Sequence, residues 1–100
     1  MINVMLVCSA GMSTSLLVKK MKEYAAKKGI EVNIWANAEA EAKSFWEKAD
    51  IILLGPQVKY LEPKIKEMVR NKIPVAVIDM MAYGMMNGQK VLEDALAKLS

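Results

Sequence analysis

The sequence predicts an α/β fold built on a four-stranded parallel sheet, in the strand order 2-1-3-4, with helices on both faces. Short apolar runs alternate with longer stretches in which apolar residues recur at helical spacing, which gives the order βαβαβαβα. Strands that are separated by helices pair in parallel through right-handed crossovers. We expect one domain over residues 1–100, because domains of about 100–150 residues are the commonest.

The first half of the chain predicts two strands and the helix between them. Residues 2–7 (INVMLV) are typical of a buried parallel strand, and residues 13–28 of an amphipathic helix that ends at Gly29. Residues 31–36 alternate between apolar and polar side chains, as in a half-covered edge strand. The apolar face of the predicted helix consists of Leu17, Met21, Tyr24 and Ala25.

The second half predicts three helices and two strands. Asn37 is placed to cap a helix over residues 38–48, and residues 51–54 (IILL) follow as a buried strand. The next helix tolerates Pro63 only in its first turn, and residues 75–78 (VAVI) form the fourth strand. Buried positions are expected at Leu61, Ile65, Met68 and Val69 in the third helix and at Val91, Leu92, Ala95, Leu96 and Leu99 in the last.

The composition excludes several kinds of site. The chain has no histidine and one cysteine, so it builds no Cys–His pair, no internal disulfide and no thiolate zinc cage. Its net charge of +3 is mild, the difference between 14 basic and 11 acidic residues. The basic residues are dispersed, which indicates solvated helix faces rather than a nucleic-acid surface. No apolar run approaches the roughly 18 residues of a membrane span, and no basic segment precedes Met12 as it would in a secretory signal. We therefore expect a cytoplasmic protein that uses no metal and no cofactor.

A loop of small residues follows the first strand. In open parallel sheets, ligands bind beyond the carboxyl ends of the strands where the strand order reverses, which is here beyond strands 1 and 3. Cys8 lies at that edge, shortly before a predicted helix. The residues that follow it are Ser9, Ala10, Gly11, Met12, Ser13, Thr14 and Ser15.

This loop predicts an anion site with a nucleophile at its mouth. Successive backbone N–H groups of small residues turn inward to cradle an anion, and the helix N-terminus adds donors and a positive dipole end. Both favour the thiolate of Cys8 over its thiol. A thiolate among phosphate-binding donors suits attack on phosphorus and formation of a phosphocysteine. The alternative is an inert cysteine buried at a strand end, because free cysteine is among the most buried residue types.

The spacing within the loop favours a carrier over a hydrolase. Cysteine phosphatases carry Cys-x5-Arg-Ser/Thr, and the same spacing from Cys8 reaches Thr14, followed by Ser15. The arginine that would clamp the phosphoryl oxygens and stabilise transition-state charge is missing. A nucleotide-binding P-loop is excluded too, because the loop holds one glycine and Lys19 comes too late. The motif therefore indicates storage of a phosphoryl group rather than its hydrolysis.

The chain resembles the enzyme IIB component of the lactose/cellobiose family of the bacterial phosphoenolpyruvate-dependent sugar phosphotransferase system. The resemblance rests on residues 8–18 (CSAGMSTSLLV), 54–57 (LGPQ) and 77–79 (VID), and it extends over essentially the whole chain. It implies a fold like that of low-molecular-weight cysteine phosphatases. It also implies that a phosphohistidine on enzyme IIA donates its phosphoryl group to Cys8. The cysteine then passes it to a β-linked disaccharide, such as cellobiose or chitobiose, that enters through the membrane component, enzyme IIC. Transient docking to both partners fits a monomer.

Two other functions stay open on the residues alone. The Cys-x5 spacing leaves a small cysteine-dependent phosphatase, which would turn over an aryl phosphate without a partner. A redox-sensing interaction domain, whose cysteine is oxidised rather than phosphorylated, would show peroxide-sensitive partner binding and no phosphoryl adduct.

Further residues near the strand ends have two interpretations each. Gln57 is either a contact for the phosphoryl group or a residue that follows the Gly55-Pro56 turn. Asp79 is either a proton donor or the cap of the next segment.

Methionines and tryptophans are the remaining large side chains of interest. Flexible thioethers suit a surface that accepts two partners, and they equally fill cores. The four that flank the Ala82-Tyr83-Gly84 segment are Met80, Met81, Met85 and Met86, and Met12 in the loop is expected to meet a docking protein. Trp35 and Trp46 are expected to be packing residues.

Overall fold

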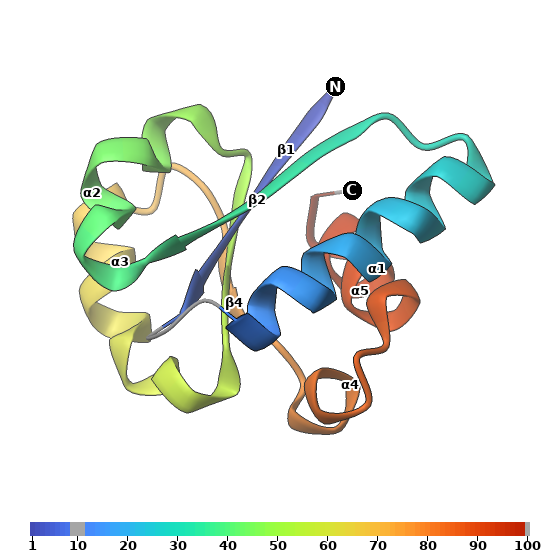
Figure 1. Cartoon of the computed structure of the whole chain (residues 1–100). Helices are drawn as coiled ribbons and strands as arrows, with labels where there is room; N and C mark the ends of the chain where they lie inside the picture. The colour runs from blue at the N-terminus through green and yellow to red at the C-terminus, as the bar shows by residue number, and fades with distance from the viewer. Residues whose placement is uncertain (9–11, 100) are drawn as a thin grey trace.

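Four parallel strands form the sheet, and their order confirms the predicted arrangement. The computed structural model describes residues 1–8 and 12–99, with the backbone alone at residues 12 and 13. The strands lie in the order β2-β1-β3-β4 and all pair in parallel (Figure 1). Their bounds are Ile2–Cys8 for β1, Val32–Ala38 for β2, Ile51–Leu54 for β3 and Val75–Val77 for β4.

Helices cover both faces of the sheet, as the sequence predicts. α1 and α5 lie on one face and α2 and α3 on the other, while α4 lies near the first turn of α1 (Figure 1). The α-helices are α1 (Met12–Lys28), α2 (Ala42–Phe45), α3 (Glu62–Val69), α4 (Met80–Gly84) and α5 (Gly88–Leu99), and the 3₁₀ helices are η1 (Glu39–Glu41), η2 (Trp46–Lys48) and η3 (Pro56–Leu61). Over the stretches 1–8 and 12–99, no helix has the length and apolar character needed to span a membrane.

β1 contributes to two cores, one on each side of the sheet. Val4 and Leu6 belong to the core that α1 and α5 complete, and both are fully buried. Met5 and Val7 belong to the core that α2, η3 and α3 complete, and they are also fully buried. Side chains alternate between the faces of a strand, so a strand covered on both faces is an unbroken apolar run. The buried run leads directly to Cys8, the last residue of β1.

The N-terminus of α5 approaches α1 closely at Gly88. A Cβ atom built on Gly88 would lie 2.5 Å from the carbonyl carbon of Lys20 and 2.6 Å from the backbone nitrogen of Met21. Only a residue without a Cβ allows two backbones to come this near. Glycine at this position therefore sets the distance between the two helices that cover one face.

Local start and stop signals are confirmed at two helices. Gly29 follows α1 with a φ of +70°, the left-handed conformation that ends many helices. Pro63 lies in the first turn of α3, where its missing N–H removes no intrahelical hydrogen bond. The six residues of η3, which lead into α3, and the short helix α4 are additions that the periodicity does not predict.

The predicted helix over residues 38–48 is confirmed in part, because residues 39–48 are helical, but the predicted cap at Asn37 is wrong. β2 continues to Ala38, which pairs with Cys8, so Asn37 lies in extended backbone inside a strand and caps no helix. Its side-chain oxygen instead accepts a hydrogen bond of 2.7 Å from Nε1 of Trp35. The stretch beyond β2 is divided into η1, α2 and η2. Pairing with β1 thus keeps Asn37 and Ala38 extended, and helical structure begins at Glu39.

Candidate functional site

The carboxyl edge of the sheet brings together the segments that follow β1, β3 and β4. The register pairs Val7 with Leu54 and Leu54 with Val77, so the three strands end at nearly the same level. β2 and β3 lie on opposite sides of β1, which makes this the point where the strand order reverses. Ligands of open parallel sheets bind at such a point. The site that the sequence predicts would therefore lie at the carboxyl edge of these strands.

Cys8 occupies the last position of β1 at this edge. Its side chain is 1% exposed, and its Sγ donates a weak hydrogen bond of 3.9 Å to the carbonyl oxygen of Asn37 in β2. The sequence places this thiol at the mouth of a loop, whereas the structure covers it almost completely. Outside residues 9–11 and 100, no cluster of three or more Cys, Asp or Glu side chains is arranged to hold a metal ion.

Most of the loop residues after Cys8 are not among the residues that the structure describes. Ser9, Ala10 and Gly11 lie outside the described residues, and so do the side chains of Met12 and Ser13. The predicted anion nest and the docking role of Met12 therefore stay predictions. What the structure shows is that α1 begins at residue 12, so a helix N-terminus follows the cysteine within four residues.

Thr14 and Ser15, the last two predicted loop residues, have opposite environments. Thr14 is 1% exposed, and among the described residues it is the buried polar side chain. Its Oγ1 lies 3.3 Å from the hydroxyl oxygen of Tyr83, within hydrogen-bond distance. Ser15 is exposed on α1. The position that an arginine occupies in cysteine phosphatases is thus filled by a buried hydroxyl.

Tyr83 contacts side chains from the other two segments at this edge. It was not among the site residues predicted from the sequence. Nε2 of Gln57 donates a hydrogen bond of 3.1 Å to the Tyr83 hydroxyl oxygen, which also faces Thr14. Gln57 comes from η3 after β3, Tyr83 from α4 after β4, and Thr14 from α1 after β1. Nothing in its immediate sequence marks Tyr83, which lies in α4 and not directly after β4.

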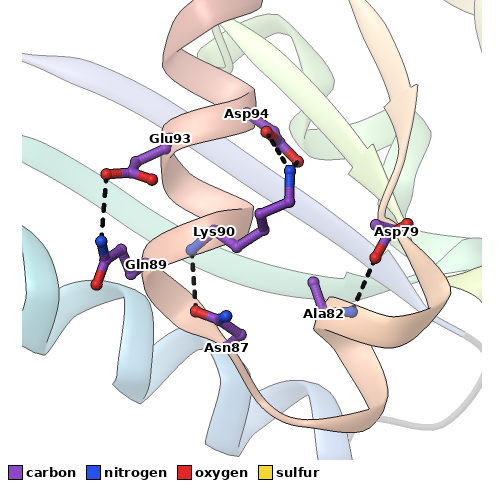
Figure 2. Close-up of polar contacts among 7 residues, drawn as sticks. All are labelled: Asp79, Ala82, Asn87, Gln89, Lys90, Glu93 and Asp94. Atoms are coloured by element: carbon purple, nitrogen blue, oxygen red, sulfur yellow. Dashed lines mark hydrogen bonds and ion pairs between the residues drawn. The ribbon is translucent and has the colours of Figure 1, made fainter.

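Asp79 caps α4, which confirms the second of its two interpretations. Its Oδ2 accepts a hydrogen bond of 3.0 Å from the backbone N–H of Ala82, and Figure 2 shows the carboxylate above the first turn of the helix. The backbone oxygen of Asp79 accepts a further bond of 2.9 Å from the N–H of Tyr83. In the same view Asn87 accepts from the N–H of Lys90 at 3.1 Å and so caps α5. The Asp79 cap stabilises the first turn of α4, which carries Tyr83, and the Asn87 cap does the same for α5.

The methionines near the last strand divide between surface and core. Met80 and Met81 on α4 and Met85 directly after it are 68–73% exposed and form what we call the methionine face. Met86 is half-buried and packs against the core on the α1 side. Trp35 and Trp46 pack against the opposite core, which confirms that they are packing residues. The methionine face is therefore an apolar surface at the same edge of the sheet as Cys8.

Comparisons with known proteins identify what the chain resembles. A family model described as the lactose/cellobiose-specific IIB subunit of the phosphotransferase system matches residues 3–94. An oligo-β-mannoside-specific EIIB component of Bacillus subtilis is 53% identical over 95 residues, which cover 94% of this chain and 92% of the relative. A galactose-specific EIIB component of Lactococcus lactis is 43% identical over 96 residues, with 90% of this chain and 89% of the relative covered. The solution structure of a cellobiose-specific phosphotransferase IIB component from Borrelia burgdorferi has a TM-score of 0.80 and 40% identity, and the match covers 97% of this chain and 90% of that one.

Proposed function

Because the chain belongs to the lactose/cellobiose-specific IIB family of the sugar phosphotransferase system, we propose that it carries a phosphoryl group on Cys8. The observation that supports this most directly is the position of the only cysteine. It ends the central strand at the reversal of strand order and lies four residues before the N-terminus of α1. Unpaired N–H groups at such a helix end favour both a thiolate and a bound phosphoryl group.

The proposed reaction has two transfer steps. In the first, Sγ of Cys8 attacks phosphorus and the S–P bond forms as the N–P bond of a phosphohistidine on enzyme IIA breaks. The imidazole keeps the electron pair of that bond, and the proton lost by the thiol goes to the medium. In the second, a sugar hydroxyl oxygen attacks phosphorus, sulfur leaves with the electron pair as thiolate, and the hydroxyl proton is released to water. The donor histidine belongs to the partner, because this chain has none.

The acceptor that we propose is a β-linked disaccharide of the cellobiose or chitobiose kind, delivered through the membrane component, enzyme IIC. Two of the relatives are specific for an oligo-β-mannoside and for cellobiose, and a third for galactose. The protein acts as a monomer in the cytoplasm and docks to enzyme IIA and enzyme IIC in turn. The methionine face supports this role, since flexible thioethers adapt to two different surfaces.

The burial of Cys8 requires that the thiol be uncovered during each transfer. Displacement at phosphorus needs the attacking and leaving atoms in line, so a sulfur that is 1% exposed accepts no phosphoryl group while it stays covered. Cover at other times excludes water from the phosphocysteine and limits its hydrolysis. Thr14 in place of an arginine acts in the same direction, because no guanidinium stabilises the charge of hydrolysis.

Mapping of the phosphoryl group tests the proposal. Wild-type protein, Cys8→Ser and Cys8→Ala are each mixed with phosphorylated enzyme IIA and followed by phosphorus NMR and mass spectrometry. The wild type is expected to show a sulfur-bound phosphate on Cys8, and both variants are expected to show none. Label at another residue, or label that persists in Cys8→Ala, would refute the proposal. Turnover of an aryl phosphate by the wild type alone would instead indicate a phosphatase, and peroxide-sensitive partner binding without an adduct would indicate a redox sensor.

A further inference from the structure

The excess positive charge of the chain lies on α1. Basic residues occur in several elements, but acidic residues offset them only outside this helix. α1 carries five lysines and one glutamate, a formal charge of +4, whereas the whole chain carries +3, so all other residues together carry −1. The five lysines are Lys19, Lys20, Lys22, Lys27 and Lys28.

These lysines lie on the outer side of α1, and we call them the lysine face. The inner side of the helix is buried in the core that α5 completes, through Leu17, Met21 and Ala25, and Figure 1 shows α1 in the layer that covers this side of the sheet. All five lysines are exposed. Within residues 1–8 and 12–99, the ion pairs involve other lysines, so no carboxylate is paired with the lysine face.

The lysine face suits a broad anionic surface better than a single small anion. Lys19 and Lys28 are nine residues apart, which is about 14 Å along a helix axis. Lysine is a point charge on a flexible stem, whereas arginine provides the planar fork that clamps one phosphate or carboxylate. The only arginine of the chain, Arg70, lies outside α1. Leu16, which is 46% exposed, adds an apolar side chain to the same helix.

We propose that the lysine face binds the anionic lipid headgroups of the membrane in which enzyme IIC lies. The inference rests on the proposed function, which brings the chain to that membrane. Each lysine near an anionic leaflet strengthens binding about fivefold, and the attraction is confined to about a Debye length. The contact thus concentrates the chain beside enzyme IIC. Because α1 begins four residues after Cys8, it also keeps the site within one helix length, about 25 Å, of the surface.

Two triple variants with the same change in net charge separate this surface from the charge of the whole chain. The α1 variant combines Lys19→Gln, Lys22→Gln and Lys27→Gln, because glutamine keeps a high helix propensity. The control variant replaces three exposed lysines that lie outside α1, and it combines Lys43→Gln, Lys59→Gln and Lys72→Gln. Circular dichroism and thermal unfolding establish that both variants are folded.

The assay is cosedimentation with lipid vesicles, with no partner protein present. Vesicles of equal parts phosphatidylglycerol and phosphatidylcholine are compared with vesicles of phosphatidylcholine alone. The wild type and the control variant are expected to sediment with the anionic vesicles only, and to be released at about 1 M salt, where the Debye length is about 3 Å. The α1 variant should bind about a hundredfold more weakly, since each of its three lost lysines contributes about fivefold.

Transfer from phosphorylated enzyme IIA to Cys8 without vesicles is the second readout, and it should be unchanged in both variants. A raised KM for enzyme IIA in the α1 variant alone, with no vesicle binding by the wild type, would assign the lysine face to an acidic protein and overturn the inference. Equal losses of vesicle binding in the two variants would also overturn it, because net charge would then explain the binding. A wild type that binds anionic vesicles but takes up no phosphoryl group on Cys8 would refute the proposed function and leave the lipid-binding surface in place.

Discussion

Gly88→Ala should destabilise the fold by about 2 kcal/mol, because it places a Cβ where α5 meets the backbone of α1. The added carbon would lie 2.5 Å from the Lys20 carbonyl carbon, and α5 must retreat by roughly 0.9 Å to reach the 3.4 Å at which ordinary contact begins. Overpacking costs about 1–3 kcal/mol, and a contact this short with backbone belongs near the upper end of that range; the gain of about 0.5–1 kcal/mol that alanine brings over glycine in a helix offsets part of it.

The assay is thermal and urea unfolding followed by circular dichroism. For 100 residues the entropy of unfolding is about 0.2 kcal/mol per kelvin, so a loss of 2 kcal/mol lowers the midpoint by about 10 °C. Gly84→Ala is the matched control, because a Cβ on Gly84 meets nothing within 4 Å and its midpoint should stay at or slightly above that of the wild type. Equal midpoints for the two variants would show that the α1–α5 distance does not depend on glycine.

Other expected outcomes concern caps and surface charges. Asp79→Ala should lower the free energy of unfolding in urea by about 1 kcal/mol, because the first turn of α4 loses its capping carboxylate, and Asp79→Asn should keep most of that stability; equal losses would contradict the capping role. The pKa of the Tyr24 hydroxyl is raised above 10.0, first because it donates a hydrogen bond of 2.7 Å to Glu93 and then through desolvation and the negative charge of that carboxylate. The stability that this bond adds is therefore complete below pH 10.0 and lost as the pH rises through the raised pKa. The tyrosinate absorbance of the wild type, after subtraction of that of Tyr24→Phe, should rise with a midpoint above pH 10.0. Glu93→Gln should lower that midpoint. Lys90→Ala should change the free energy of unfolding by less than about 0.5 kcal/mol, because its pair with Asp94 is exposed; a larger loss, measured at moderate salt, would mean that the pair is more than a surface contact.

The architecture was predictable because its signals are local and repeated. Unbroken apolar runs at 51–54 and helical spacing over 13–28 each indicate one element, and right-handed crossovers then leave few topologies. The prediction was less accurate at residues 37–48, where Asn37 caps no helix and the helical stretch over residues 39–48 is divided into η1, α2 and η2. The pairing of Ala38 with Cys8, thirty residues apart, keeps the backbone extended up to Ala38, so the helical stretch begins only at Glu39. Propensity carries no information about such a distant partner.

The site was predictable only as far as residue types allow. Cys8 is noticeable because it is a rare residue after a strand and before a loop of small residues, and the resemblance adds the family. Tyr83 has no such local signal, since its importance depends on three strand ends that meet at one edge. The burial of Cys8 belonged to one of the two alternatives that the sequence left open, and residue types could not decide between them because burial is a property of tertiary packing.

The burial of the Cys8 sulfur also affects whether two copies of this chain form a disulfide with each other. Two chains join covalently only when both sulfur atoms come within bonding distance, about 2 Å. With its single cysteine almost wholly covered, the chain does not cross-link to a second copy on encounter, even at high concentration. Covalent dimers that form slowly in the presence of an added thiol oxidant, which takes up the two electrons and two protons, would therefore report how often the sulfur becomes exposed.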